Sequence, residues 1–342
     1  MSLLITILAT AIIFAVIIFI HELGHFTVAK LSGIKVHEFA LGMGPTIFKF
    51  QKGETKYALR AFPIGGFVSM EGEDEGSDEE SAFCNKPVWK RICVILAGAF
   101  MNILLGFILM TIITSSQSEF IGLQVGEFRE GATSSQSLQV GDKIEKIDGL
   151  RLFEVSDYSY AMTREKRDTH NIQVNRGGKT MNFENVKIST VEIDTANGKA
   201  NAYDLKLTRD PKNVGTVISH ATGKTVSFAR LIWVSFIDLV TGKEKITELS
   251  GPIGVAGVVG QAASMGFLNL LIIAAMITIN VGIFNLMPLP ALDGGRLIFL
   301  LIELVTRKRV PPKYEGYVHG VGLALLLLLM FFVTISDVVK LF

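Results

Sequence analysis

Charged residues and cysteines are scarce in this chain of 342 residues. Asp, Glu, Lys and Arg make up 19% of it, against about 25% in typical soluble domains, and the mean hydropathy is +0.43. The formal net charge of +1 gives no indication of a nucleic-acid partner. Only Cys84 and Cys93 are present, too few for a disulfide framework or a cysteine-rich zinc site. Low charge and high hydropathy instead favour a membrane protein.

Four apolar segments are long enough to cross a bilayer, which takes about 20 helical residues. They are predicted at residues 4–30, 92–114, 267–286 and 318–336, the third inside an uncharged stretch from residue 249 to 292. No basic residue precedes the first segment, and its apolar run is longer than the core of a typical secretion signal. We therefore expect it to be retained as a membrane helix.

Lysine and arginine gather near the ends of these segments and predict the orientation of the chain. The basic residues lie on the loop after the first span and on the loop between the third and fourth spans: Lys30, Lys35, Lys86, Lys90, Arg91, Arg296, Arg307, Lys308, Arg309 and Lys313. Both loops should be cytoplasmic, so the N-terminus and the region from about 117 to 264 should lie outside. Spans one and three then run in the same direction and end on the same side.

Residues 120–210 have the pattern of a separate soluble domain. Short β-type runs at 143–147 and 171–174 are separated by turn signals such as Asp148-Gly149 and Gly177-Gly178, with a predicted helix at 155–163. After this domain, residues 228–240 form either an interfacial helix or a packed connector, and the sequence favours neither. Seven acidic residues between Glu71 and Glu80 predict a solvated loop.

Metal-ligand spacing occurs at the end of the first span, in His21-Glu22-Leu23-Gly24-His25. Histidines at i and i+4 share one helix face, so both imidazoles can reach one metal ion, with Glu22 beside it as a base. Ionisable groups at membrane depth are costly and tend to be functional. The alternative is a pair of structural histidines between helices, which would leave Glu22 buried without purpose. His37, His170, His220 and His319 have no partner at ligand spacing.

A catalytic zinc usually has three protein ligands and one open position. Asp293 is the candidate for the third ligand, because it is the only acid between residues 249 and 295 and follows span three on the side where His21 is expected. Pro288 and Pro290 break the helix there, and broken backbone at membrane depth is tolerated where it lines a cavity or is buried. The three side chains predict one catalytic Zn²⁺, with Glu22 moving the proton from water to the leaving amine.

Two of the asparagines in the apolar helices are candidates for a role in the site. Asn285 and Asn102 can each hold substrate backbone or tie helices together. The position of Asn285 beside the proline motif favours substrate binding, whereas for Asn102 both interpretations stay open.

Together these residues resemble the site-2 protease family of intramembrane zinc metalloproteases (peptidase M50), in its bacterial RseP/RasP type. His21–His25 is similar to the HExxH of that family, and Asn285–Gly294 to its N-x-x-P-x-P-x-L-D-G segment. The resemblance covers nearly the whole chain. It implies that His21, His25 and Asp293 bind zinc and that Asn285, Pro288 and Pro290 lie at the substrate.

Two further segments carry the resemblance. Residues 62–68 are similar to a membrane-re-entrant β-loop, which implies that Gly65, Gly66 and Phe67 present the substrate as a strand. Residues 126–152 resemble a PDZ domain, which implies a filter that excludes large substrates or a receptor for new C-termini; size exclusion needs no carboxylate-binding loop and is favoured. Residues 250–254 are similar to another recurring segment of the family.

The resemblance implies a polytopic α-helical membrane protein of about four transmembrane helices, with a re-entrant β-loop and one inserted extracytoplasmic PDZ-like α/β domain. The expected parts are 1–116 and 265–342 for the membrane catalytic region, 117–210 for the PDZ-like domain and 211–264 for a connector. Expected substrates are single-span membrane proteins, namely anti-sigma factors and remnant signal peptides, cut in a bacterial plasma membrane near the cytoplasmic side. Membrane lipid is the other expected partner.

Three other functions fit the sequence less well than this one. An inactive scaffold binding partners through its PDZ-like domain would not need Glu22. A metal transporter would want charged residues in several spans, and spans two and four offer almost none. A zinc protease with an external active site conflicts with the orientation predicted from the basic loops.

Overall fold

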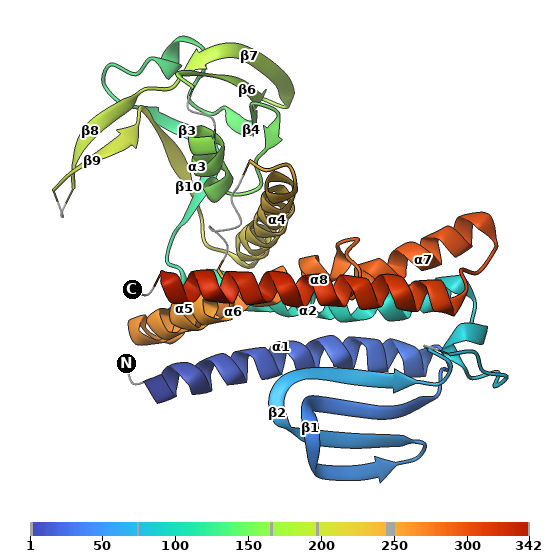
Figure 1. Cartoon of the computed structure of the whole chain (residues 1–342). Helices are drawn as coiled ribbons and strands as arrows, with labels where there is room; N and C mark the ends of the chain where they lie inside the picture. Colours follow the sequence, from blue (N-terminus) through green and yellow to red (C-terminus); the bar gives the residue numbers. More distant parts are fainter. Residues whose placement is uncertain (1–2, 74, 165–166, 196–197, 244–249, 341–342) are drawn as a thin grey trace. The chain divides into compact units, whose positions relative to one another are not determined.

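The computed structural model describes residues 3–73, 75–164, 167–195, 198–243 and 250–340 (Figure 1). The chain divides into two compact units. Unit 1 comprises residues 1–109 and 231–342, and unit 2 comprises residues 110–230. Unit 2 is therefore inserted between two halves of unit 1 in the sequence.

Within the described residues, four helices are long and apolar enough to cross a membrane, as predicted. They are α1 (Leu3–Leu31), α2 (Val88–Ser116), α6 (Phe267–Leu286) and α8 (Pro312–Val339). Helices are favoured in such segments because they satisfy every backbone N–H and C=O without water. The chain is thus a multi-pass membrane protein.

Two shorter helices flank α6 and were not predicted from the sequence. The uncharged stretch before α6 contains α5 (Pro252–Met265), which is separated from α6 by Gly266 at φ +117°. The loop after α6 leads into α7 (Asp293–Thr306), so the proline motif interrupts the helical path for only a few residues. The carboxylate of Asp337, from α8, accepts hydrogen bonds at the start of α5, at 3.1 Å from the N–H of the N-cap residue Gly251 and 2.8 Å from that of Gly254.

A two-stranded sheet lies against α1 in unit 1, formed by β1 (Val36–Lys52) and β2 (Thr55–Met70) (Figure 1). The long strands bend, so that one part of β1 pairs twice: Ala40 lies opposite both Phe67 and Ala58, and Leu41 opposite both Gly66 and Leu59. The expected β-structure at 62–68 is therefore present. The far part of the sheet exposes large apolar side chains, namely Met43, Ile47, Phe48, Phe50 and Phe62.

In the acidic segment, residues 75, 76 and 78–80 are exposed, as expected for a solvated loop, and two of the described acids also form ion pairs. Glu79 binds Lys35 at 3.0 Å, and Glu73 forms an ion pair with Arg296 of α7. Charge density alone did not reveal these pairs, because their basic partners lie far away in the sequence. A short 3-10 helix, η1 (Phe83–Asn85), leads from this segment to α2.

Unit 2 is built on a sheet with the strand order β10-β3-β4-β6-β7, with β5 paired to β4. The strands are β3 (Phe120–Phe128), β4 (Lys143–Ile147), β5 (Leu150–Arg151), β6 (Thr169–Arg176), β7 (Lys179–Lys187) and β10 (Leu205–Asp210). A separate pair is formed by β8 (Thr190–Thr195) and β9 (Gly198–Tyr203). The remaining elements are α3 (Val155–Arg164), α4 (Val214–Val240) and the 3-10 helix η2 (Ser134–Gln136). The strands predicted at 143–147 and 171–174 and the helix predicted at 155–163 are confirmed.

The core of unit 2 consists of alternating apolar side chains from its strands, including Val125, Ile144, Ile147, Ile172 and Val174. Alternation places these residues on one face of the sheet. Asp204 is buried beside this core and accepts hydrogen bonds from the backbone and hydroxyl groups of Thr133, Ser134 and Ser189. Burial alone would raise the pKa of Asp204, but the hydrogen bonds from Ser134 and Ser189 hold it below its usual value.

Helix α4 begins at Val214, well before the helix predicted at 228–240. Within unit 2, His220 of α4 lies between two carboxylates, 2.9 Å from Glu154 and 3.1 Å from Asp210. Arg230 forms an ion pair with Asp157 of α3. The first part of α4 is thus a packed element of unit 2, which the apolar pattern of 228–240 could not show.

Candidate metal centre

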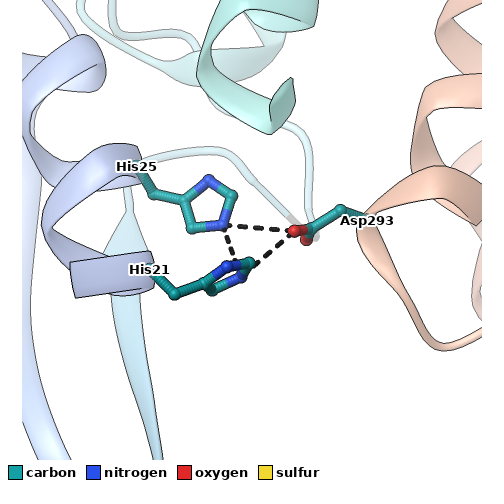
Figure 2. Close-up of side chains that lie close together, drawn as sticks. All are labelled: His21, His25 and Asp293. Atoms are coloured by element: carbon teal, nitrogen blue, oxygen red, sulfur yellow. Dashed lines mark hydrogen bonds and ion pairs between the residues drawn. The ribbon is translucent and has the colours of Figure 1, made fainter. Parts of the chain in front are cut away.

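Three side chains predicted as metal ligands converge in unit 1 (Figure 2). His21 Nε2 and His25 Nε2 lie 3.2 Å apart, and Asp293 Oδ2 lies 3.2 Å from the first and 3.4 Å from the second. Among the described residues, this is the one group of three such side chains whose ligand atoms come together. The predicted approach of Asp293 to the two histidines of the first span is therefore present in the fold.

The spacing of these atoms fits a metal ion. Ligands about 2.0–2.1 Å from a tetrahedral zinc lie roughly 3.3–3.4 Å from one another. The three separations of 3.2, 3.2 and 3.4 Å match that value. Within the described part of the chain, Asp293 Oδ2 is buried without a hydrogen-bond donor of acceptable geometry. A buried carboxylate oxygen of this kind needs a cation, and a divalent ion between the two imidazoles would satisfy it.

Helix α2 supports both imidazoles along a single stripe of its surface. The carbonyl oxygen of Val94 lies 2.8 Å from His25 Nδ1, and Asn102 Nδ2 lies 3.3 Å from His21 Nδ1. Gly98 lies midway between these two residues, at i+4 from Val94. A Cβ added at Gly98 would lie 2.7 Å from His21 Cε1 and would overlap His25 Nε2. Val94 thus orients the ring of His25, and Asn102 contacts the ring of His21. Gly98, between them, leaves room for both rings.

The contact with Asn102 bears on the tautomer of His21. A neutral imidazole that binds a metal through Nε2 carries its proton on Nδ1 and needs an acceptor there. Asn102 is fully buried, and its Oδ1 has no hydrogen-bond partner among the described residues. Because the oxygen and nitrogen of an amide are interchangeable by rotation, a rotated Asn102 would offer its Oδ1 as the acceptor that the metal-bound form of His21 requires. The contact joins α2 to α1, and substrate binding by Asn102 stays a prediction.

Glu22 lies beside the metal ligands without joining them, as expected for a base. The side chain is half-buried, and a Cβ added at Gly66 of β2 would lie 3.0 Å from Glu22 Cγ. The absence of a side chain at residue 66 therefore lets β2 approach the acid closely. One edge of the site is formed by an extended strand.

The other residues predicted to bind substrate lie near this strand or on the loop after α6. Gly65 has φ +78°, and Phe67 lies under the guanidinium of Arg60, 4.8 Å from the ring centre. Asn285 is half-buried in the last turn of α6, and its side chain forms no hydrogen bond within the described part of the chain. Pro290 packs against α8, while Pro288 is exposed.

Sequence reasoning missed Gly98 and the contact made by His319. Gly98 precedes Asn102 by one helical turn in an apolar span, and that spacing was its only signal. His319 of α8 has no partner at ligand spacing in the sequence, and its Nδ1 accepts a hydrogen bond from the N–H of Ala291 at 2.9 Å. A bond to backbone leaves no pattern in the sequence.

Comparison with known proteins agrees with this arrangement. The profile of peptidase family M50 matches residues 9–329. A Fusobacterium nucleatum protein, named as a candidate zinc metalloprotease, is 36% identical over 98% of this chain and 99% of its own length. A similarly named Clostridium acetobutylicum protein is 36% identical over 95% of both chains. The regulator of sigma-W protease RasP of Bacillus subtilis is 29% identical over 98% of this chain and 99% of its own length. Since the family match spans nearly the whole chain, the protein belongs to peptidase family M50.

Proposed function

We propose that this M50 peptidase is a zinc-dependent intramembrane endopeptidase of the site-2 protease type, which cuts single-span membrane proteins. The observation that carries the proposal is the convergence of His21, His25 and Asp293, at metal-ligand spacing, beside Glu22 in an apolar helix. The names of similar proteins as zinc metalloproteases support the choice of metal. One ion fits the three ligand atoms.

Each residue would have a distinct part in peptide-bond hydrolysis. His21, His25 and Asp293 hold the ion, which supplies the Lewis acidity that activates water and polarises the scissile carbonyl. Glu22 takes the proton from the attacking water and passes it to the leaving amine, as a general base and then a general acid. Asn102 and the Val94 carbonyl orient the two imidazoles.

The approach of β2 to Glu22 supports binding of substrate as an extended strand. Gly65, Gly66 and Phe67 would pair with the backbone of the substrate, and Asn285, with Pro288 and Pro290, would hold its other side. A transmembrane helix must unwind before it can pair in this way, since its backbone groups are otherwise occupied. Helix-breaking residues near the cut should therefore favour cleavage. The exposed apolar side chains at the far end of the β1–β2 sheet suit a re-entrant loop in lipid.

The remaining parts of the chain fit the same proposal. Residues 117–210, within unit 2, would form a PDZ-like domain that admits single-span proteins and excludes large extracytoplasmic domains. Residues 211–264 would connect it to the second membrane region, 265–342, which completes the first, 1–116. Basic residues after α1 and α7 favour a cytoplasmic position for those loops in a bacterial plasma membrane, with the N-terminus and unit 2 outside. Anti-sigma factors and remnant signal peptides are the proposed substrates, and the name of the B. subtilis relative supports the first class.

The test is cleavage of a tagged single-span substrate by the full chain purified in detergent. Wild type, Glu22→Gln and Asp293→Ala are compared with and without a chelator, and zinc content is measured for each. Wild type should cleave, and chelation should stop it. Glu22→Gln should retain zinc and lose activity, whereas Asp293→Ala should lose both. Cleavage by Glu22→Gln at the wild-type rate would overturn the mechanism, and cleavage unaffected by metal loss would overturn the function.

A further inference from the structure

The loop from α6 to α7, residues 287–292, ends directly at the third metal ligand. Ala291, two residues before Asp293, has φ +72°, in the left-handed region. An L-residue with a Cβ pays roughly 1–2 kcal/mol there, and alanine has no polar side chain to offset this cost. Within the loop, the N–H of Leu292 donates to the carbonyl of Leu289 at 3.3 Å and closes a turn across Pro290 and Ala291. Contacts from outside the loop add to this bond.

Helix α8 supplies two contacts at this point. His319 Nδ1 accepts the hydrogen bond from the N–H of Ala291 at 2.9 Å, which requires the tautomer protonated at Nε2. Gly322 follows on α8, and a Cβ added there would lie 3.0 Å from the backbone carbon of Pro290 and overlap its side chain. Helix α8 thus contacts the loop in two ways. His319 accepts a hydrogen bond from Ala291, and Gly322, which has no side chain, lets Pro290 pack closely against the helix.

Movement of the loop would be passed on to Asp293. Cβ atoms added at Gly294 and Gly295 would meet the backbone of the loop itself, that at Gly295 lying 2.5 Å from the carbonyl oxygen of Leu289. The N–H of Gly295 also donates to the carbonyl of Leu292 at 3.0 Å. The first turn of α7 and the loop are therefore one closely packed piece, and a shift at Ala291 displaces the carboxylate.

We propose that His319 and Gly322 of α8 are positioning residues that fix the strained loop and thereby set Asp293 at metal-ligand distance. The proposal rests on the proposed function, since it concerns the same metal site. It gives α8, which provides no ligand, a direct part in metal affinity. A histidine that only filled space between helices would affect folding and leave metal affinity unchanged.

The zinc affinity of the full chain, measured in detergent by competition with a chromogenic chelator, tests the proposal. His319→Phe keeps an aromatic ring and removes the acceptor, and it should weaken zinc binding about 10-fold or more, the loss typical when a supporting partner of a ligand is removed. Adding Ala291→Gly should recover a large part of that loss, because glycine adopts positive φ without penalty. Ala291→Gly alone should bind zinc at least as tightly as wild type.

A pair of glycines on α8 gives a second, independent comparison. Gly322→Ala should also weaken zinc binding, since its Cβ overlaps Pro290, whereas a Cβ at Gly320 has no heavy atom within 4 Å and Gly320→Ala should match wild type. Zinc affinities of His319→Phe and Gly322→Ala within twofold of wild type would overturn the proposal. So would a loss in His319→Phe that Ala291→Gly does not reduce. Wild type that binds no zinc, or Asp293→Ala that binds it normally, would instead overturn the proposed function.

Discussion

Replacement of Gly98 by alanine should damage the metal centre although residue 98 is no ligand. The added Cβ would lie 2.7 Å from His21 Cε1 and His25 Cε1 and would overlap His25 Nε2. Carbon atoms in contact normally lie about 3.5–4.0 Å apart, so the rings must retreat by roughly 1 Å. Bonds to zinc tolerate deviations of about 0.2 Å. His25 cannot retreat this far and remain a ligand while its Nδ1 stays bonded to the Val94 carbonyl.

The expected magnitude follows from this displacement. Overpacking a core by one methyl group costs about 1–3 kcal/mol, and loss of ligand geometry adds to it. Because about 1.4 kcal/mol corresponds to a tenfold change, we expect zinc affinity to fall at least 10- to 100-fold, with a parallel loss of peptidase activity. Competition with a chelator measures the affinity, and metal analysis of the purified protein measures the occupancy.

Gly106→Ala is the matched control, because Gly106 lies on α2 like Gly98. Its added Cβ would overlap Ile279 of α6 instead of the imidazoles. This variant should lose stability by a similar amount and retain zinc. The reasoning is refuted if Gly98→Ala binds zinc as tightly as wild type, or if Gly106→Ala loses zinc to the same extent.

Three more substitutions test other contacts. Asn102→Ala removes the acceptor for the ring proton of His21 and should lower zinc affinity about 10- to 100-fold at unchanged stoichiometry, measured by chelator competition. Asp204→Asn should destabilise unit 2 by about 2–3 kcal/mol near neutral pH, seen as faster hydrogen exchange in β10. Since the folded pKa of Asp204 is lowered, its contribution is present above about pH 4 and fades as the pH falls further, so wild type and variant should converge there. Asp337→Ala removes the acceptor for two N–H groups of α5 and should cost about 1–2 kcal/mol, read as faster exchange in the first turn of α5.

The three side chains that converge, His21, His25 and Asp293, could be predicted from the sequence because each stands out locally. His21 and His25 have helical ligand spacing, and Asp293 is an isolated acid in an apolar stretch. The four long helices could be predicted for the same reason, since hydropathy over about 20 residues is a local property. The strands of unit 2 showed the alternation of a half-buried sheet.

What could not be predicted depends on how distant segments approach one another. The need for glycine at residue 98 arises only from the closeness of α1 and α2, and the role of His319 only from a bond to backbone in another element. Helix α7 was missed because Pro288 and Pro290 indicated a break, and the sequence did not show that a new helix starts three residues after the second proline. The double pairing of Ala40 in the β1–β2 sheet likewise depends on how the strands bend, which no local pattern specifies.

The insertion of unit 2 between the two halves of unit 1 affects the order in which the site residues are synthesised. The two histidines are made early, and Asp293 follows about 270 residues later, which takes tens of seconds at roughly 5–20 residues per second. Throughout that interval α1 carries His21, Glu22 and His25 with no third ligand. If Asp293 is the third ligand, as we propose, the nascent chain enters the membrane without a complete metal site, and any fragment that stops before residue 293 should be inactive. Proteolytic capacity arises only when the last quarter of the polypeptide folds back onto the first helix.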